Sequence, residues 1–111
     1  MTSPQQRKGS AAEREICALL RSQGLPDVDR AYGAGRPDDK GDLDGLPEVY
    51  AQVKHYADGW RAVREALAAG DASGMPWPVG FVRYPRQPLW VATMRAESWA
   101  SLYRDALRAR A

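Results

Sequence analysis

Residues 41–55, GDLDGLPEVYAQVKH, place three acidic side chains and a lysine within two short strand-like runs. A glycine and a proline divide the stretch, so we predict strands at 42–46 and 48–55. Successive side chains of a strand point to opposite faces. Gln52 and Lys54 are therefore predicted to share one face, with the apolar residues between them on the other.

Apolar periodicity predicts the elements that surround these two strands. Helices are expected at 10–23, 58–70 and 97–110, and further strands at 28–33, 78–84 and 89–94. The alternation of helices and strands predicts an α/β fold, a single domain with a central mixed β-sheet flanked by helices.

Capping residues and apolar positions give these helices predicted ends and faces. Ser10 is the expected N-cap of the first helix, and Gly70 is the expected stop of the second. In the second helix we expect Trp60 to point inward together with Val63 and Leu67. The last helix has an apolar side made of Trp99, Leu102, Tyr103, Ala106 and Leu107.

Length and composition favour one domain over residues 1–111, with residues 1–9 as a flexible basic arm. The single cysteine, Cys17, excludes an internal disulfide, and no apolar run approaches membrane-spanning length. We therefore expect a cytoplasmic protein without a membrane partner. The formal net charge is +2, but an acidic middle, residues 27–48, lies between two basic ends.

The residues that could carry chemistry are oxygen donors and one lysine. One histidine and one cysteine cannot form a zinc cluster, and no phosphate-binding glycine loop is present. Oxygen ligands suit Mg²⁺ or Mn²⁺, which can activate water for attack on a phosphate. Asp42, Gln52 and Lys54 would converge if their strands are neighbours, and Glu13 on the first helix could reach the same place.

Four segments of the chain resemble the PD-(D/E)XK nuclease superfamily. They are RKGSAAERE (7–15), DRAYGAG (29–35), GDLDG (41–45) and QVK (52–54). Within the superfamily, their order and spacing are similar to the archaeal-type Holliday junction resolvases and their bacteriophage relatives. The resemblance implies a restriction-endonuclease-like αβββαβ core and a Mg²⁺-dependent endonuclease of DNA recombination and repair.

The resemblance also implies roles for the site residues. Asp42 would be the central metal ligand, Glu13 a metal-linked carboxylate and Lys54 the catalytic lysine. Gln52 stands where the family usually has an acid, so it would be a neutral ligand and metal affinity should be lower. The implied DNA contacts come from basic residues: Arg7, Lys8, Arg14, Arg30 and Arg36.

The implied partners are a four-way DNA junction and a second copy of the chain. A homodimer would place two sites on opposite strands, each cutting one phosphodiester to leave 5′-phosphate and 3′-hydroxyl ends.

Alternatives remain open for the site and for the function. Asp38 or Asp44 could replace Asp42 as the main acidic ligand, although Asp42 begins the strand-like step. Another nuclease of the superfamily, with nicking, repair or restriction-like activity, would keep the same fold. A non-catalytic DNA-binding module, with Gln52 as the mark of a decayed site, and a small structural protein are the other classes.

Overall fold

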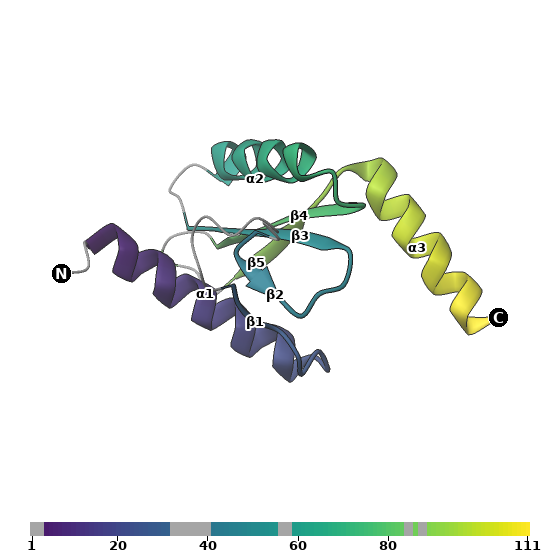
Figure 1. Ribbon diagram of the computed structural model, residues 1–111, viewed down its shortest axis with the longest axis horizontal. Helices are drawn as coiled ribbons and strands as arrows, with labels where there is room; N and C mark the ends of the chain where they lie inside the picture. Colours follow the sequence, from purple (N-terminus) through teal and green to yellow (C-terminus); the bar gives the residue numbers. More distant parts are fainter. Residues whose placement is uncertain (1–3, 32–40, 56–58, 84–85, 87–88) are drawn as a thin grey trace.

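The structure is a computed structural model that describes residues 4–31, 41–55, 59–83, 86 and 89–111, and the side chains of 4–10 are outside this description. Its elements, in chain order (Figure 1), are α1 (Pro4–Ser22), β1 (Asp29–Arg30), β2 (Leu43–Asp44), β3 (Val49–Lys54), α2 (Gly59–Ser73), β4 (Trp77–Arg83), β5 (Trp90–Thr93) and α3 (Ala96–Arg110).

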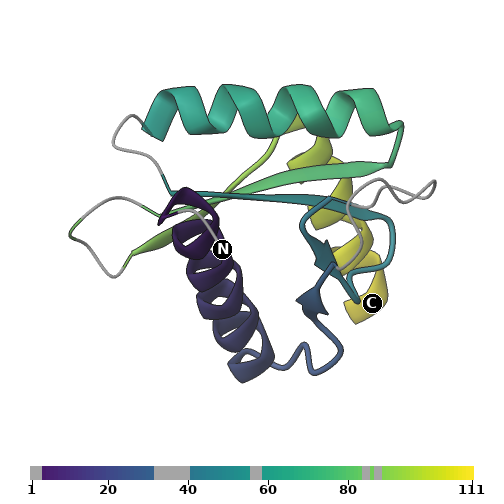
Figure 2. The same ribbon diagram turned by 60° about the vertical axis from the view of Figure 1, so that its left-hand side comes forward.

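The central sheet is mixed and has the strand order β3-β4-β5. β3 and β4 run parallel, with α2 as the crossover between them, whereas β4 and β5 form the predicted antiparallel hairpin. A two-residue antiparallel ladder joins β1 to β2, and a bridge between Gly41 and Ala51 ties this ladder to β3. Figure 2 shows α1 and α2 on opposite faces of the sheet. The predicted α/β domain with a mixed sheet flanked by helices is confirmed.

The buried core lies between α1 and the sheet. Ile16 and Cys17 of α1 are almost fully buried, and they belong to one cluster with Val28, Leu43, Ala51, Val79 and Phe81. Val49 and Val53 pack against the same cluster, whereas Lys54 makes an ion pair with α2. The alternation predicted for the strand at 48–55 therefore holds.

The face that α2 turns to the sheet differs from the prediction. Trp60 is 69% exposed, and the buried residues of the helix are Ala62, Ala66 and Gly70. A Cβ added at Gly70 would lie 2.2 Å from the Cβ of Pro78 on β4. Small side chains let the helix lie directly on the strands. Gly70 therefore serves close packing inside the helix, and the predicted stop at this glycine is wrong.

The start of α1 also differs from the prediction. The helix begins at Pro4, so Ser10 is not its N-cap, and residues 4–9 of the expected flexible arm form its first turns. Proline is favoured in the first turn because its missing N–H has no helical acceptor there. The glutamines and basic residues that follow are good helix formers, which offsets the cost of Gly9.

α3 differs from the expectation that every helix packs on the sheet. No residue of α3 is buried, and Figure 1 shows the helix projecting away from the rest of the chain. Its predicted apolar side is present but faces outward. Among the described helices, none is long and apolar enough to span a membrane.

Candidate functional site

Asp42 is held by three hydrogen bonds to two backbone segments at the edge of the sheet. Its backbone N–H donates to the carbonyl of Ala51 at 2.7 Å, and its own carbonyl accepts from the N–H of Ala31 at 2.9 Å. Its side-chain Oδ2 accepts from the N–H of Val53 on β3 at 2.8 Å. A carboxylate that accepts a backbone N–H has a defined direction before any ligand arrives.

Gly41 is what allows Asp42 to come this close to β3. Its φ of +86° lies in the left-handed region, which side chains with a Cβ disfavour. A Cβ at this position would lie 2.3 Å from the carbonyl oxygen of Ala51. The close backbone contact of Gly41 with Ala51 therefore places the acidic side chain of Asp42 at the edge of β3.

Glu13 faces Asp42 from α1 and is paired with Arg30 of β1. Its Oε1 accepts from Nε of Arg30 at 3.0 Å, and both side chains are about one-fifth exposed (22% and 21%). Burial raises the pKa of the Glu13 carboxyl, the hydrogen bond from Arg30 opposes this, and the negative charge of Asp42 raises it further. The two carboxylates are thus near enough to repel each other.

Gln52 and Lys54 project from the face of β3 that α2 covers. Nε2 of Gln52 donates to the hydroxyl of Tyr50 at 3.3 Å. Nζ of Lys54 lies 3.9 Å from Oε2 of Glu65 on α2. The predicted shared face is therefore present.

The predicted residues fall into two groups that meet at one stretch of β3. Glu13 of α1 is within electrostatic range of Asp42, whereas Lys54, on the same face of β3 as Gln52, makes an ion pair with Glu65 of α2. Asp42 accepts from the N–H of Val53, which lies between Gln52 and Lys54 in the chain. The carboxylate of Asp42 consequently lies beside the backbone of β3, between the positions of Gln52 and Lys54.

The donor atoms at this edge suit a hard divalent cation. Mg²⁺ usually takes one or two carboxylates and keeps several waters. Glu13 and Asp42 supply two oxygen donors whose mutual repulsion a cation would relieve. Within the described ranges, no group of three or more histidine, cysteine, aspartate or glutamate side chains is arranged to hold a metal. The residues therefore fit a loosely held, water-rich ion rather than a closed structural site.

Of the predicted DNA-contacting residues, the structure places two. Arg14 is exposed on α1, whereas Arg30 is half-buried and bonded to Glu13. The side chains of Arg7 and Lys8 and the whole of Arg36 lie outside the described residues. Their predicted contacts with DNA stay predictions.

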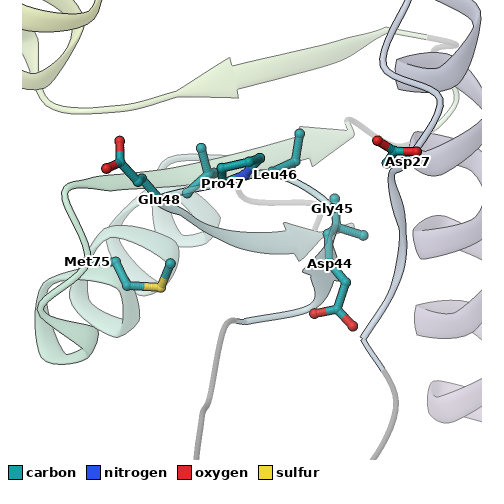
Figure 3. Close-up of a pocket in the computed structure, with 9 residues that line it drawn as sticks. Asp27, Asp44, Gly45, Leu46, Pro47, Glu48 and Met75 are labelled. Carbon is teal, nitrogen blue, oxygen red and sulfur yellow. The ribbon is translucent and has the colours of Figure 1, made fainter.

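Asp38 and Asp44 were the two alternatives to Asp42 as the main acidic ligand. Asp38 lies outside the described residues. Asp44 lines an open cleft of about 440 Å³ that also contains Asp27 and Glu48, and none of the predicted catalytic residues lines it. In Figure 3 the carboxylates of these three acids point in different directions rather than at one another. The geometry therefore favours Asp42, which faces a second carboxylate.

The structure also contains a second polar cluster, which the sequence did not predict and which includes His55, the residue after Lys54. Oε1 of Glu15 accepts from Nε of Arg83 at 2.8 Å and from the indole N–H of Trp90 at 2.9 Å. Nη1 of Arg83 lies 3.2 Å from Nε2 of His55. These residues are up to 75 positions apart in the chain, so no local pattern could reveal the cluster.

The site and fold define an α/β protein with paired carboxylates at the edge of a mixed sheet. Comparisons with family models, with curated proteins and with solved structures found no match. The functional conclusion therefore rests on the residues themselves.

Proposed function

We propose that this chain is a Mg²⁺-dependent, structure-selective DNA endonuclease of the PD-(D/E)XK type that acts on four-way junctions as a homodimer. The observation that carries the proposal is the carboxylate of Asp42 held on the N–H of Val53, between Gln52 and Lys54 in the chain and within electrostatic range of Glu13. Burial, and to a smaller extent the charge of Asp42, raise the pKa of Glu13, and a perturbed pKa of this kind is typical of functional sites. The α/β fold and the predicted order of motifs support the same reading.

Each residue of the site has a role that its contacts support. Asp42 and Glu13 would hold the ion, which when bound supplies positive charge to the phosphate and lowers the pKa of water. Asp42 is already oriented by the N–H of Val53, so little reorganisation is needed on binding. Arg30 holds the Glu13 carboxylate in place and offsets part of its charge.

Lys54 is the residue assigned to the reacting water and phosphate. Its side chain is 22% exposed, and its Nζ lies 3.9 Å from Oε2 of Glu65 on α2. Hydrolysis forms a bond from the water oxygen to phosphorus and breaks the bond to the 3′ oxygen. That oxygen takes up a proton and leaves as the 3′-hydroxyl.

Gln52 makes the site less anionic than the usual arrangement. Its amide N–H is used by the hydroxyl of Tyr50, and the carbonyl oxygen is the only ligand atom it could offer to a cation. We expect a metal affinity weaker than that of a site with a third carboxylate. Gln52→Glu should therefore lower the Mg²⁺ concentration needed for half-maximal cleavage.

The proposal is tested with a labelled synthetic four-way junction, incubated with and without Mg²⁺ and resolved on a denaturing gel. Lys54→Ala should abolish cleavage and leave junction binding largely intact. Arg64→Ala, which also removes one exposed cation but lies on α2, is the matched control and should keep cutting. Undiminished cleavage by the Lys54 variant would refute the assignment.

Asp42 needs a variant that separates its charge from its hydrogen bond. Asp42→Asn keeps an oxygen that can accept from the N–H of Val53, so the fold should persist while cleavage is lost. A fully active Asp42→Asn protein would exclude this aspartate as the ligand. Parallel reactions on a junction, a flap and a plain duplex at one salt concentration separate a junction resolvase from other nucleases of the type.

A non-catalytic DNA-binding module is the second candidate, favoured by the ion pair of Lys54 with Glu65 and by the neutral Gln52. A calorimetric titration with Mn²⁺ distinguishes the two. Junction binding without heat from Mn²⁺ and without cleavage would support the binding module.

A further inference from the structure

Arg83 is a cation near the proposed site that the proposed chemistry does not use. It is the last residue of β4, and the parallel register places it beside the end of β3, level with His55. Ligands of open α/β sheets bind outside the carboxyl ends of the parallel strands. Arg83 therefore stands at the end of the sheet where a ligand of this fold is expected.

Two contacts fix the direction of the Arg83 guanidinium. Its Nε donates to Oε1 of Glu15 on α1 at 2.8 Å, and its Nη1 lies 3.2 Å from Nε2 of His55. The side chain is 23% exposed, and its third nitrogen, Nη2, has no hydrogen-bond partner within the part of the chain that the structure describes. An arginine with a fixed direction and spare N–H donors suits a phosphate group, which it can bind through two parallel hydrogen bonds.

The carboxylate of Glu15 offsets only part of the charge of this arginine. Its Oε1 also accepts from the indole N–H of Trp90 at 2.9 Å, so two donors share one oxygen. The Glu15 side chain is 48% exposed, and an ion pair with so exposed a carboxylate is screened by water and adds little to stability. The contact has a clearer effect on orientation, because an arginine that is already held loses less conformational entropy when it binds an anion.

The distance from Arg83 to the proposed metal site is short on the scale of DNA. Asp42 accepts from the N–H of Val53, and His55, which contacts Arg83, is two positions further along the chain. Two strand positions span about 6–7 Å. Each strand of duplex DNA carries one phosphate in about 3.4 Å of helix axis. A DNA strand with one phosphate at Asp42 therefore has further phosphates within reach of Arg83.

We propose that Arg83, oriented by Glu15 and His55, is a phosphate-binding residue that contacts the DNA backbone within a few nucleotides of the scissile bond. The inference rests on the proposed function, because it takes the substrate to be DNA, and it adds a contact that the resemblance does not assign. Arg83 binds through its charge and its N–H donors and takes no part in breaking the bond. Its loss should therefore raise the KM of cleavage more than it lowers kcat.

The salt dependence of binding tests this contact directly. Fluorescence anisotropy of a labelled synthetic four-way junction, without Mg²⁺ so that the DNA stays uncut, gives the Kd at each salt concentration. Each phosphate that a protein cation neutralises contributes about 0.9 to the slope of log Kd against log salt. Arg83→Ala should lower that slope by about 0.9, so its deficit in affinity should shrink roughly 3.5-fold between ~50 and ~200 mM salt. A merely structural role would weaken binding by the same factor at every salt concentration.

Three further variants are the matched controls. Arg83→Lys keeps the cation and should keep most of the slope. Trp90→Phe removes the other hydrogen bond to Glu15 without removing a charge, so its slope should be that of the wild type. Arg108→Ala removes one exposed cation from α3, which projects away from the sheet (Figure 1), and should also keep the wild-type slope. An unchanged slope in Arg83→Ala, or an equal loss in Arg108→Ala, would overturn the assignment.

Binding and cleavage are measured separately, so the two claims can fail separately. A junction that is bound with a lower slope in Arg83→Ala, but is never cut when Mg²⁺ is added, would support the phosphate contact and refute the nuclease. Cleavage by the wild type together with an unchanged slope in Arg83→Ala would refute the contact alone. A wild-type protein that binds no junction at any salt concentration would refute both.

Discussion

Gly41→Ala should destabilise the fold and displace Asp42 at the proposed site. The left-handed φ of +86° costs an alanine about 1–2 kcal/mol. The new Cβ would also lie 2.3 Å from the carbonyl oxygen of Ala51, and relief of such an overlap typically costs about 1–3 kcal/mol. The two terms together predict a loss of about 2–5 kcal/mol in the free energy of unfolding, or a Tm lower by roughly 10–20 °C.

Gly24→Ala separates the two terms. Gly24 also has a left-handed φ, +98°, but nothing lies within 4 Å of its Cβ position. Only the backbone cost of about 1–2 kcal/mol applies there. Urea denaturation followed by circular dichroism gives both values, and the Gly41 variant should lose clearly more than its control.

The same pair of variants reports on function. Displacement of residue 41 moves Asp42, so Gly41→Ala should lose cleavage even at temperatures where it remains folded, while Gly24→Ala should keep it. Equal losses of stability in the two variants would contradict the close approach of the chain to Ala51. A stable, inactive Gly24 variant would show that activity is lost by a route other than displacement of Asp42.

Three further predictions follow from individual contacts. Gly70→Ala should lower the free energy of unfolding, measured in urea, by about 1–2 kcal/mol because the added Cβ would overlap Pro78 of β4, even though alanine is the better helix former. A gain in stability would mean that α2 does not contact β4 at this point. Because burial raises the pKa of Glu13, its contribution to stability is present at low pH and is lost as the pH rises through that pKa. The free energy of unfolding of Glu13→Gln, measured relative to that of the wild type, should therefore increase as the pH rises above about 4. A difference between the two proteins that is the same at every pH would refute this prediction. Trp90→Phe removes the indole N–H that donates a hydrogen bond to Glu15, so the free energy of unfolding from thermal denaturation should fall by ~0.5–1 kcal/mol. An unchanged stability would show that this hydrogen bond is absent in solution.

The local sequence pattern was sufficient to predict the faces of the strands, but not which face of a helix packs on the sheet. Alternation placed Gln52 and Lys54 on one face because the period of a strand does not depend on what covers it. In α2, two rows of residues at helical spacing compete: the large one with Trp60 and the small one with Ala62 and Ala66. The close approach to the sheet selects the small row, and that distance is a tertiary property.

Side-chain contacts between residues distant in the chain could not be predicted from the sequence for the same reason. The acids and the lysine of the site could be chosen by residue type and order. That Arg30 holds Glu13, or that Glu65 lies beside Lys54, depends on how α1 and α2 pack on the two faces. The apolar stripe of α3 shows another limit, because periodicity predicted the stripe but could not predict that it would remain exposed instead of packing on the sheet.

The position of Asp42 at a sheet edge joins the stability of the fold to its proposed chemistry. β3 is the outer strand of its sheet, and an outer strand leaves backbone groups unpaired on one side. Asp42 uses its N–H and its carboxylate to pair two of those groups, and it thereby brings a negative charge to the strand. α1 and α2 lie on the two faces of the sheet, so Asp42 belongs to neither covered face but to the edge of β3 (Figure 2). Under the proposed function we expect the exposed Arg14 of α1 to contact the phosphates of a duplex that lies along this edge, so Arg14→Ala should weaken junction binding.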